Sequence, residues 1–361
     1  MLIHETAGGE KIYRRDNSIV VLFPGPRRVV ASTRINGGLR EDLVALFNHH
    51  LPPERCTVES LPGGSAEAYL ALTAEALGLP PERAAGMLTA AKMENASIKE
   101  CTYRDLTVTA VVTAGVDVNG GRAGDPASYY ERDGKWEYVG GTINIILLLN
   151  GNLLPHVLVR AVVTATEAKA AALQELMAPS RVSPDIATGS GTDQIAIAAV
   201  PDSPCTFTDA GKHSKLGELI GRCVKEAVKE ALEKETGLNA GRQQSFLARL
   251  ARYGLTEEDF WRAAGPGTVT NGEEYRQKLA VLAQEEKLVA LAAALLHLLD
   301  EYRWGLLTAP AVLAAGEALL RSCLPLFRSG SIEKEEDPVS GLLRMFVEGV
   351  NNLLLAQAGV N

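Results

Sequence analysis

Polar residues that can do chemistry gather at the ends of apolar runs in four stretches of the sequence. These stretches are residues 112–130, 140–156, 187–198 and 211–221. They supply hydroxyl, amide, carboxylate and imidazole groups, which suit nucleophilic and acid–base chemistry. Because the loops beside sheet strands usually carry ligands in α/β proteins, these stretches are the first candidates for a site.

In the second stretch, Thr142 and Asn144 lie two residues apart at the start of an apolar run. On a strand they face the same side and would present a hydroxyl and an amide to one substrate. The plain alternative is that both satisfy neighbouring backbone groups. Asn150, at the other end of the run, is a candidate substrate contact.

The fourth stretch places His213 at the start of a predicted helix. Free backbone N–H groups and the positive end of the helix dipole favour a neutral imidazole there, which suits a general base. A solvent-facing histidine in a capping loop is the alternative. Ser214 and Lys215 are candidate substrate contacts beside it.

The third stretch, ATGSGTD, ends at Asp193. Its small residues permit close backbone approach, so the N–H groups of residues 189–192 are candidate oxyanion donors, with Thr192 as a substrate contact. A simple glycine-rich turn is the alternative, because the order of a phosphate-binding loop is missing. Glu167 and Lys169 point to different faces of a helix, and Glu167 is the candidate for the site unless it is solvated.

In the first stretch, Asn119, Arg122 and Asp125 are candidate substrate contacts, although Asn and Gly also suit an ordinary turn. The six histidines contain no HExxH motif. The adjacent pair His49 and His50 would diverge by ~100° on a helix. We therefore predict no metal site.

The elements that position these residues alternate between strand and helix patterns up to about residue 240. The predicted strands are residues 18–23, 29–32, 105–113, 143–149 and 194–200. The predicted helices are residues 40–50, 64–77, 81–91, 153–177 and 212–235. This order indicates an α/β (α+β) fold with a layered sheet core over residues 1–240.

Beyond residue 240 only helical patterns follow, which predicts a separate all-helical domain over residues 241–361. The predicted helices are residues 243–254, 256–264, 273–299, 310–326 and 341–357. Their apolar stripes suit a plain core, although a dimer surface or a lid over a bulky ligand would also fit.

Composition limits the classes of partner. The net charge of −8 gives no basic field for nucleic acid or anionic lipid, and no run reaches the ~18 apolar residues that span a bilayer. The five scattered cysteines suggest reduced thiols. We expect a cytoplasmic protein without nucleic-acid or membrane partners, and the oligomeric state, including a homo-oligomer, stays open.

The same four stretches resemble the adenosylcobinamide amidohydrolase family (the CbiZ type). TAGV with Asn119 and RAGDPA, then GTINIILL, TEAKAAAL, ATGSGTDQIAIA and AGKHSKLGELIG follow the order of that family between about residues 10 and 235. The resemblance implies hydrolysis of the amide between the aminopropanol arm and the corrin ring of adenosylcobinamide. The product would be adenosylcobyric acid, in cobalamin salvage.

A fainter similarity links residues 141–163 to the ornithine acetyltransferase and self-processing aminopeptidase superfamily. It implies a four-layer α-β-β-α sandwich. Those enzymes expose a Ser or Thr nucleophile by self-cleavage, and no motif here indicates such processing.

Amide hydrolysis needs a nucleophile, an oxyanion donor and an acid. We expect His213 as base or acid, Thr142 as nucleophile or water-positioning hydroxyl, and Asn144 or the 189–192 backbone as oxyanion donors. Asp193 or Glu167 would orient them. No cofactor is expected beyond the cobalt corrinoid substrate. The rival hypotheses are an amidase for another amide and a non-catalytic corrinoid carrier or regulator.

Overall fold

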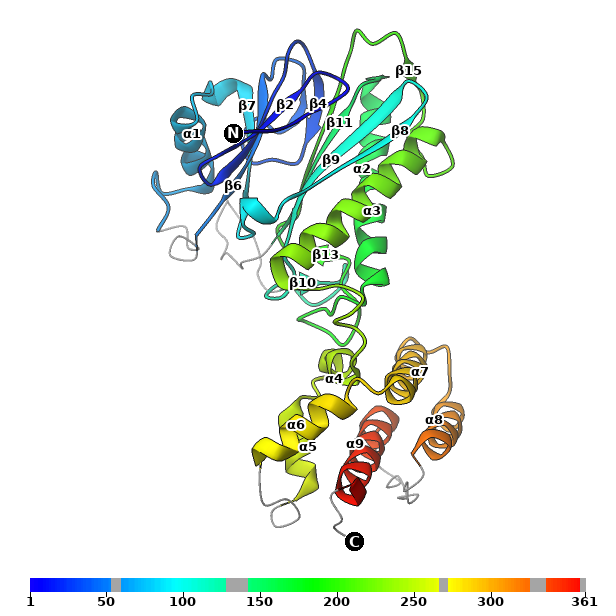
Figure 1. The fold of residues 1–361 in the computed structure, drawn as a ribbon. Helices are drawn as coiled ribbons and strands as arrows, with labels where there is room; N and C mark the ends of the chain where they lie inside the picture. Colours follow the sequence, from blue (N-terminus) through cyan, green and yellow to red (C-terminus); the bar gives the residue numbers. More distant parts are fainter. Residues whose placement is uncertain (53–59, 128–141, 266–271, 325–335, 358–361) are drawn as a thin grey trace. The chain divides into compact units, whose positions relative to one another are not determined.

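The computed structural model describes residues 1–52, 60–127, 142–265, 272–324 and 336–357. The chain divides into two compact units, Met1–Asn239 and Ala240–Asn361 (Figure 1). Each unit has its own apolar core. No helix in the described ranges is long and apolar enough to cross a membrane.

Two sheets form the centre of the N-terminal unit. The first has the strand order β1 (Leu2–Glu5), β2 (Lys11–Arg15), β3 (Ser18–Leu22), β6 (Ala45–His50), β7 (Ala84–Thr89). The second has the order β5 (Gly38–Arg40), β4 (Arg28–Ala31), β14 (Gln194–Ala199), β11 (Ile143–Leu149), β9 (Leu106–Ala114), β8 (Ser97–Tyr103). Two short pairs complete them, β10 (Gly120–Gly121) with β13 (Gly189–Ser190), and β12 (Asn152–Leu153) with β15 (Thr206–Phe207).

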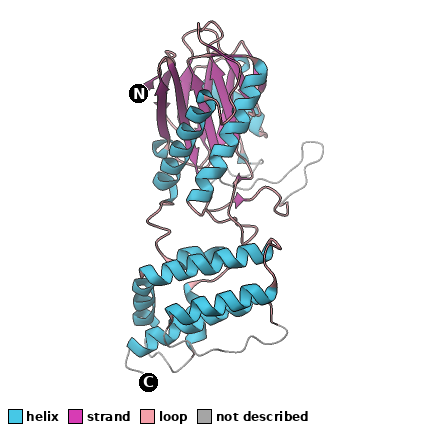
Figure 2. Cartoon of the chain, turned by 90° about the vertical axis from the view of Figure 1, so that its right-hand side faces the viewer, coloured by secondary structure: helices cyan, strands magenta, loops and turns pink. Residues whose placement is uncertain are grey.

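Helices cover the outer face of each sheet. Helix α1 (Ala66–Ala76) packs on the first sheet, and α2 (Pro155–Glu175) and α3 (Lys215–Thr236) pack on the second (Figure 2). A third apolar cluster, with Leu46 and Ile146 among its members, lies between the two sheets. The unit is therefore an α-β-β-α sandwich, which confirms the layered fold expected from the sequence.

The burial of β11 on both faces explains why residues 143–149 are almost wholly apolar. Ile143, Ile145 and Leu147 face α2 and α3, whereas Ile146 and Leu148 face the other sheet. It pairs antiparallel with β9 and parallel with β14. A strand covered on both faces needs apolar residues at almost every position.

Two predicted helices are wrong. Residues 40–50 contain β6, and residues 81–91 form a short 3-10 turn (Pro81–Arg83) followed by β7. Both strands are covered on both faces, so their sequences lack the alternation that marks a half-exposed strand and match helical spacing instead.

Helices are the regular elements of the C-terminal unit in its described residues. It contains α4 (Phe246–Leu250), α5 (Glu257–Ala264), α6 (Gly272–Leu282), α7 (Glu286–Arg303), α8 (Ala309–Cys323) and α9 (Pro338–Gln357). Phe246, Phe260 and Phe346 pack edge-on or tilted in its core. The run predicted as one helix over residues 273–299 is two, α6 and α7.

Candidate active site

Thr142 lies immediately before β11, and its side chain is held between two acceptors. Its Oγ1 is 2.7 Å from the carbonyl oxygen of Thr192 and 3.3 Å from Oδ1 of Asn144. Only 1% of Thr142 is exposed. As expected from the strand pattern, Thr142 and Asn144 face the same side, toward the first sheet.

Asn144 links the two sheets through a chain of buried amides. Its Nδ2 donates to Oδ1 of Asn48 on β6 (2.8 Å) and to the carbonyl of Leu88 on β7 (2.9 Å). Asn48 in turn donates to Oγ1 of Thr113 on β9 (2.8 Å). Because both amide hydrogens of Asn144 are used, the expectation that it donates to an oxyanion is corrected: it orients the Thr142 hydroxyl.

Asp193 fixes the backbone next to Thr142. Its Oδ1 accepts from the N–H of Ile143 (2.9 Å) and from the hydroxyl of Ser190 (2.5 Å). Its Oδ2 accepts from the N–H of Ser190 (3.1 Å) and from the Lys169 ammonium. The side chains of Lys169 and Asp193 are 8% and 11% exposed, so the ion pair is nearly buried.

The loop of residues 189–192 is organised around this carboxylate. The N–H of Ser190 points to Asp193, and the N–H of Thr192 is 3.5 Å from Oγ of Ser190. These two N–H groups are directed into the loop, and the expected role of the 189–192 backbone as an oxyanion donor stays a prediction. At Gly189 a Cβ would lie 2.7 Å from Nζ of Lys169 and closer still to Asp193, so a larger residue would have to displace the ends of these two side chains.

The first polar stretch reaches the same end of the sandwich. Strand β10 pairs with β13, and the N–H of Ala123 donates to Oγ1 of Thr188 (2.9 Å). Asp125 joins this loop to Ser180 because its carboxylate accepts hydrogen bonds from the N–H of Arg122 (2.8 Å) and from the hydroxyl of Ser180 (2.7 Å). Burial alone would raise the pKa of Asp125, but hydrogen bonds from neighbouring serines outweigh it and lower that pKa. Substrate contacts by Asn119, Arg122 and Asp125 stay predictions.

The fourth stretch lies at the opposite end of the second sheet. Lys215, the first residue of α3, stacks on the ring of Tyr103 beside the start of β9. The last turn of α3 instead reaches Gly115, whose N–H donates to the carbonyl of Thr142. Ala210 and Lys212, just before His213, lie against Thr164 and Glu167 in the middle of α2. No contact between His213 and Thr142 is described, so the expected role of His213 beside Thr142 stays a prediction.

Ser214, Lys215 and Asn150 form hydrogen bonds or ion pairs within the fold. Ser214 caps α3 by accepting from the N–H of Gly217 (3.1 Å), and Lys215 pairs with Glu218 (2.5 Å). Asn150 accepts from the N–H of Thr107 and donates to the carbonyl of Asp105. The structure does not bring these side chains to Thr142.

Glu167 is half-exposed and pairs with Lys212 at 2.8 Å on the solvent side of α2. Its expected role as an orienter of the site stays a prediction, whereas Lys169, two residues further on, faces inward. Sequence reasoning missed Lys169 as a site residue, although it continues the buried series Ala161, Ala165 and Ala168 on α2. It also missed Asn48, because residues 40–50 were interpreted as a helix.

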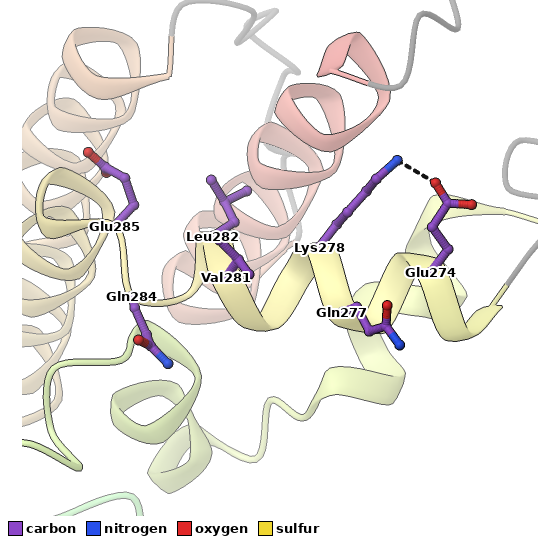
Figure 3. A pocket seen from close by; sticks show the side chains of 7 residues that line it. All are labelled: Glu274, Gln277, Lys278, Val281, Leu282, Gln284 and Glu285. Atoms are coloured by element: carbon purple, nitrogen blue, oxygen red, sulfur yellow. Dashed lines mark hydrogen bonds and ion pairs between the residues drawn. The ribbon is translucent and has the colours of Figure 1, made fainter.

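Among the described residues, no group of three or more His, Cys, Asp or Glu side chains could hold a metal ion. A groove of about 580 Å³ lies on α6 and the turn after it, in the C-terminal unit (Figure 3). Its Lys278 is paired with Glu274 at 2.7 Å, and none of the residues expected to do chemistry lines it.

Comparison with known proteins gives both a family and two sequence relatives. The family model described as adenosylcobinamide amidohydrolase matches residues 3–240. An uncharacterized protein of Methanocaldococcus jannaschii is 39% identical over 171 residues, which are 44% of this chain and 66% of that protein. The adenosylcobinamide amidohydrolase of Methanosarcina mazei is 30% identical over 210 residues, 56% of this chain and 88% of that protein.

Two solved structures share a remote similarity. A protein of Pyrococcus horikoshii aligns with a TM-score of 0.33 and 12% identity, over 64% of this chain and 81% of its own. A Burkholderia beta-aminopeptidase aligns with a TM-score of 0.30 and 15% identity, over 64% and 82%.

Proposed function

The chain belongs to the adenosylcobinamide amidohydrolase family, and from this premise we propose that it hydrolyses the amide between the aminopropanol arm and the corrin ring of adenosylcobinamide. The products are adenosylcobyric acid and aminopropanol, and the place of the reaction is corrinoid salvage in the cytoplasm. The observation that carries the proposal is the Thr142 hydroxyl, fixed at the start of β11 within the matched residues.

Thr142 is the nucleophile of this reaction. Its hydroxyl hydrogen points to one of two acceptors, Thr192 O or Asn144 Oδ1, so the oxygen lone pairs point elsewhere and are available for attack. The Asp193 carboxylate holds the adjacent N–H of Ile143 and thereby fixes the position of the nucleophile. Thr142 is 1% exposed, so the proposed attack requires a conformation in which the substrate carbonyl reaches its hydroxyl. No metal takes part.

The test is to incubate pure, chelator-treated protein with adenosylcobinamide and to follow both products by mass spectrometry. Thr142→Val is expected to lower turnover at least a hundredfold, because it keeps the shape and removes the nucleophile. Thr164→Val is the matched control, since Thr164 is also buried and also donates to a carbonyl, that of Ala210. Equal turnover in the two variants would remove Thr142 from the role.

Two rival functions have their own outcomes in this assay. Turnover of other amides but not of adenosylcobinamide would assign the same chemistry to a different substrate. Tight corrinoid binding without product would favour a carrier or regulator.

A further inference from the structure

We infer that His50 is the base that accepts the proton of the Thr142 hydroxyl. This inference rests on the proposed function. Oγ1 of Thr142 bonds to the amide carbon while its proton passes to Nε2 of His50. The imidazolium then protonates the leaving nitrogen as the C–N bond breaks. Water attacks the resulting ester, gives its proton to His50, and the Thr142 oxygen leaves with that proton.

The strand registers place His50 opposite Thr142. Asn48 on β6 and Asn144 on β11 are bonded directly across the gap between the sheets. His50 lies two residues after Asn48, and Thr142 lies two residues before Asn144, so each faces the same gap as its amide neighbour. If moving from Asn48 to His50 and from Asn144 to Thr142 leads to the same end of the sandwich, the two side chains face each other.

His50 and Thr142 do lie at the same end of the sandwich. Strand β6 runs parallel to β7, and after β7 the N–H of Lys92 reaches Glu235 in the last turn of α3. Glu235 in turn lies beside Gly115, whose N–H donates to the carbonyl of Thr142. The end of β6 is therefore the Thr142 end.

The hydrogen bonding of His50 gives it the tautomer of a base. Its Nδ1 is 3.2 Å from the carbonyl oxygen of Ala91. A carbonyl only accepts, so Nδ1 carries the hydrogen and Nε2 of the neutral ring keeps a lone pair. The side chain is half-buried, which leaves it within reach of a substrate.

Asp193 and Lys169, the charged pair next to Thr142, are bonded to each other. Asp193 accepts hydrogen bonds on both oxygens, and the Lys169 ammonium is paired with it. The adjacent His49 faces α1 instead, with Nδ1 2.7 Å from Ser18 Oγ and Nε2 3.0 Å from Tyr69 Oη. His49 therefore serves as a matched control on the same strand.

The experiment measures turnover of adenosylcobinamide by His50→Ala, His50→Gln and His49→Ala, each with and without added imidazole. Loss of a general base lowers the rate by roughly 10²–10⁴-fold. We expect such a loss of kcat with little change of KM in both His50 variants. Imidazole should restore at least part of the rate in His50→Ala, where a cavity admits it, and not in His50→Gln. His49→Ala should keep its turnover.

Turnover of His50→Ala within threefold of the wild type, or no rescue by imidazole, would overturn the inference and leave the proposed function standing. A chain found cut before Thr142 would also overturn it, because the new α-amino group would be the base. If the wild type makes no product, the rate at which a small fluorophosphonate labels Thr142 replaces turnover. Labelling that depends on His50 then supports the pair while the proposed function fails, and labelling that does not depend on His50 overturns the inference as well.

Discussion

Asp193→Asn is the substitution that most directly tests how the candidate site is held together. The asparagine keeps the size and planar shape of the carboxylate, so its Oδ1 can still accept from the N–H of Ile143 and from Ser190. The change removes the negative charge that neutralises Lys169, and it places an amide N–H where Oδ2 accepted hydrogen bonds.

The cost follows from burial. The Lys169 side chain is 8% exposed, so its charge cannot regain water without moving. Removing one partner of a buried ion pair typically costs about 3–5 kcal/mol, because the other charge stays buried and unpaired. Lys169→Met combined with Asp193→Asn removes that charge, so the double variant should be more stable than Asp193→Asn alone.

Hydrogen exchange of the β11 and β14 amides, read by mass spectrometry, measures this unit separately from the helical one. If the free energy of unfolding falls by about 3 kcal/mol, the rate at which amides exchange through unfolding rises about a hundredfold. Exchange in Asp193→Asn within a few-fold of the wild type would refute the reasoning. So would a double variant that is less stable than the single one, because the buried charge would then not be the cause.

Three further results are expected. Asn48→Ala should lower the free energy of unfolding by about 2–3 kcal/mol in urea titration, because it leaves Asn144 without a buried acceptor. Gly189→Ala should displace the buried ion pair and lower turnover, whereas Gly191→Ala, where a Cβ meets open space, should not. At Glu230 burial alone would raise the pKa, but hydrogen bonds to two lysines outweigh it and lower that pKa to about 2. Its stabilising contribution is thus present above the usual value of 4.5 and is lost as pH falls toward 2, and Glu230→Gln should remove this part of the acid dependence.

The sequence predicts the second sheet and its helices better than the first sheet. Strand β11 matches its predicted bounds, and α2 lies within two residues of them at each end. The long helix has a clear periodicity, and β11 is marked as a strand by its short length and its isoleucines rather than by alternation. Strands β6 and β7 are also covered on both faces, but they contain almost no β-branched residues, so their sequences match helical spacing.

The direction of the strands explains which of the predicted residues lie together. Strands β11 and β14 are parallel neighbours, so Thr142 and Asp193, which precede them, meet at their amino ends. Asn150 follows β11 beyond its carboxyl end, and Lys215 at the start of α3 lies at that end too, beside Tyr103. Only the direction of the strands separates the two groups, and that direction is a property of the sheet that neither sequence stretch carries by itself.

Asn144 shows why the position of the Thr142 hydroxyl and the register of β11 depend on one residue. A slip of β11 by one residue would turn its even positions from the gap between the sheets toward α2 and α3. Asn144 would then lose Asn48 and Leu88 and lie buried among apolar side chains, at a cost of about 1–3 kcal/mol for each unsatisfied group. The correct register satisfies the amide and, two residues earlier, places the buried Thr142 just before the start of the strand, within reach of Asn144 Oδ1. The contact that disfavours the wrong pairing therefore also positions the hydroxyl for chemistry.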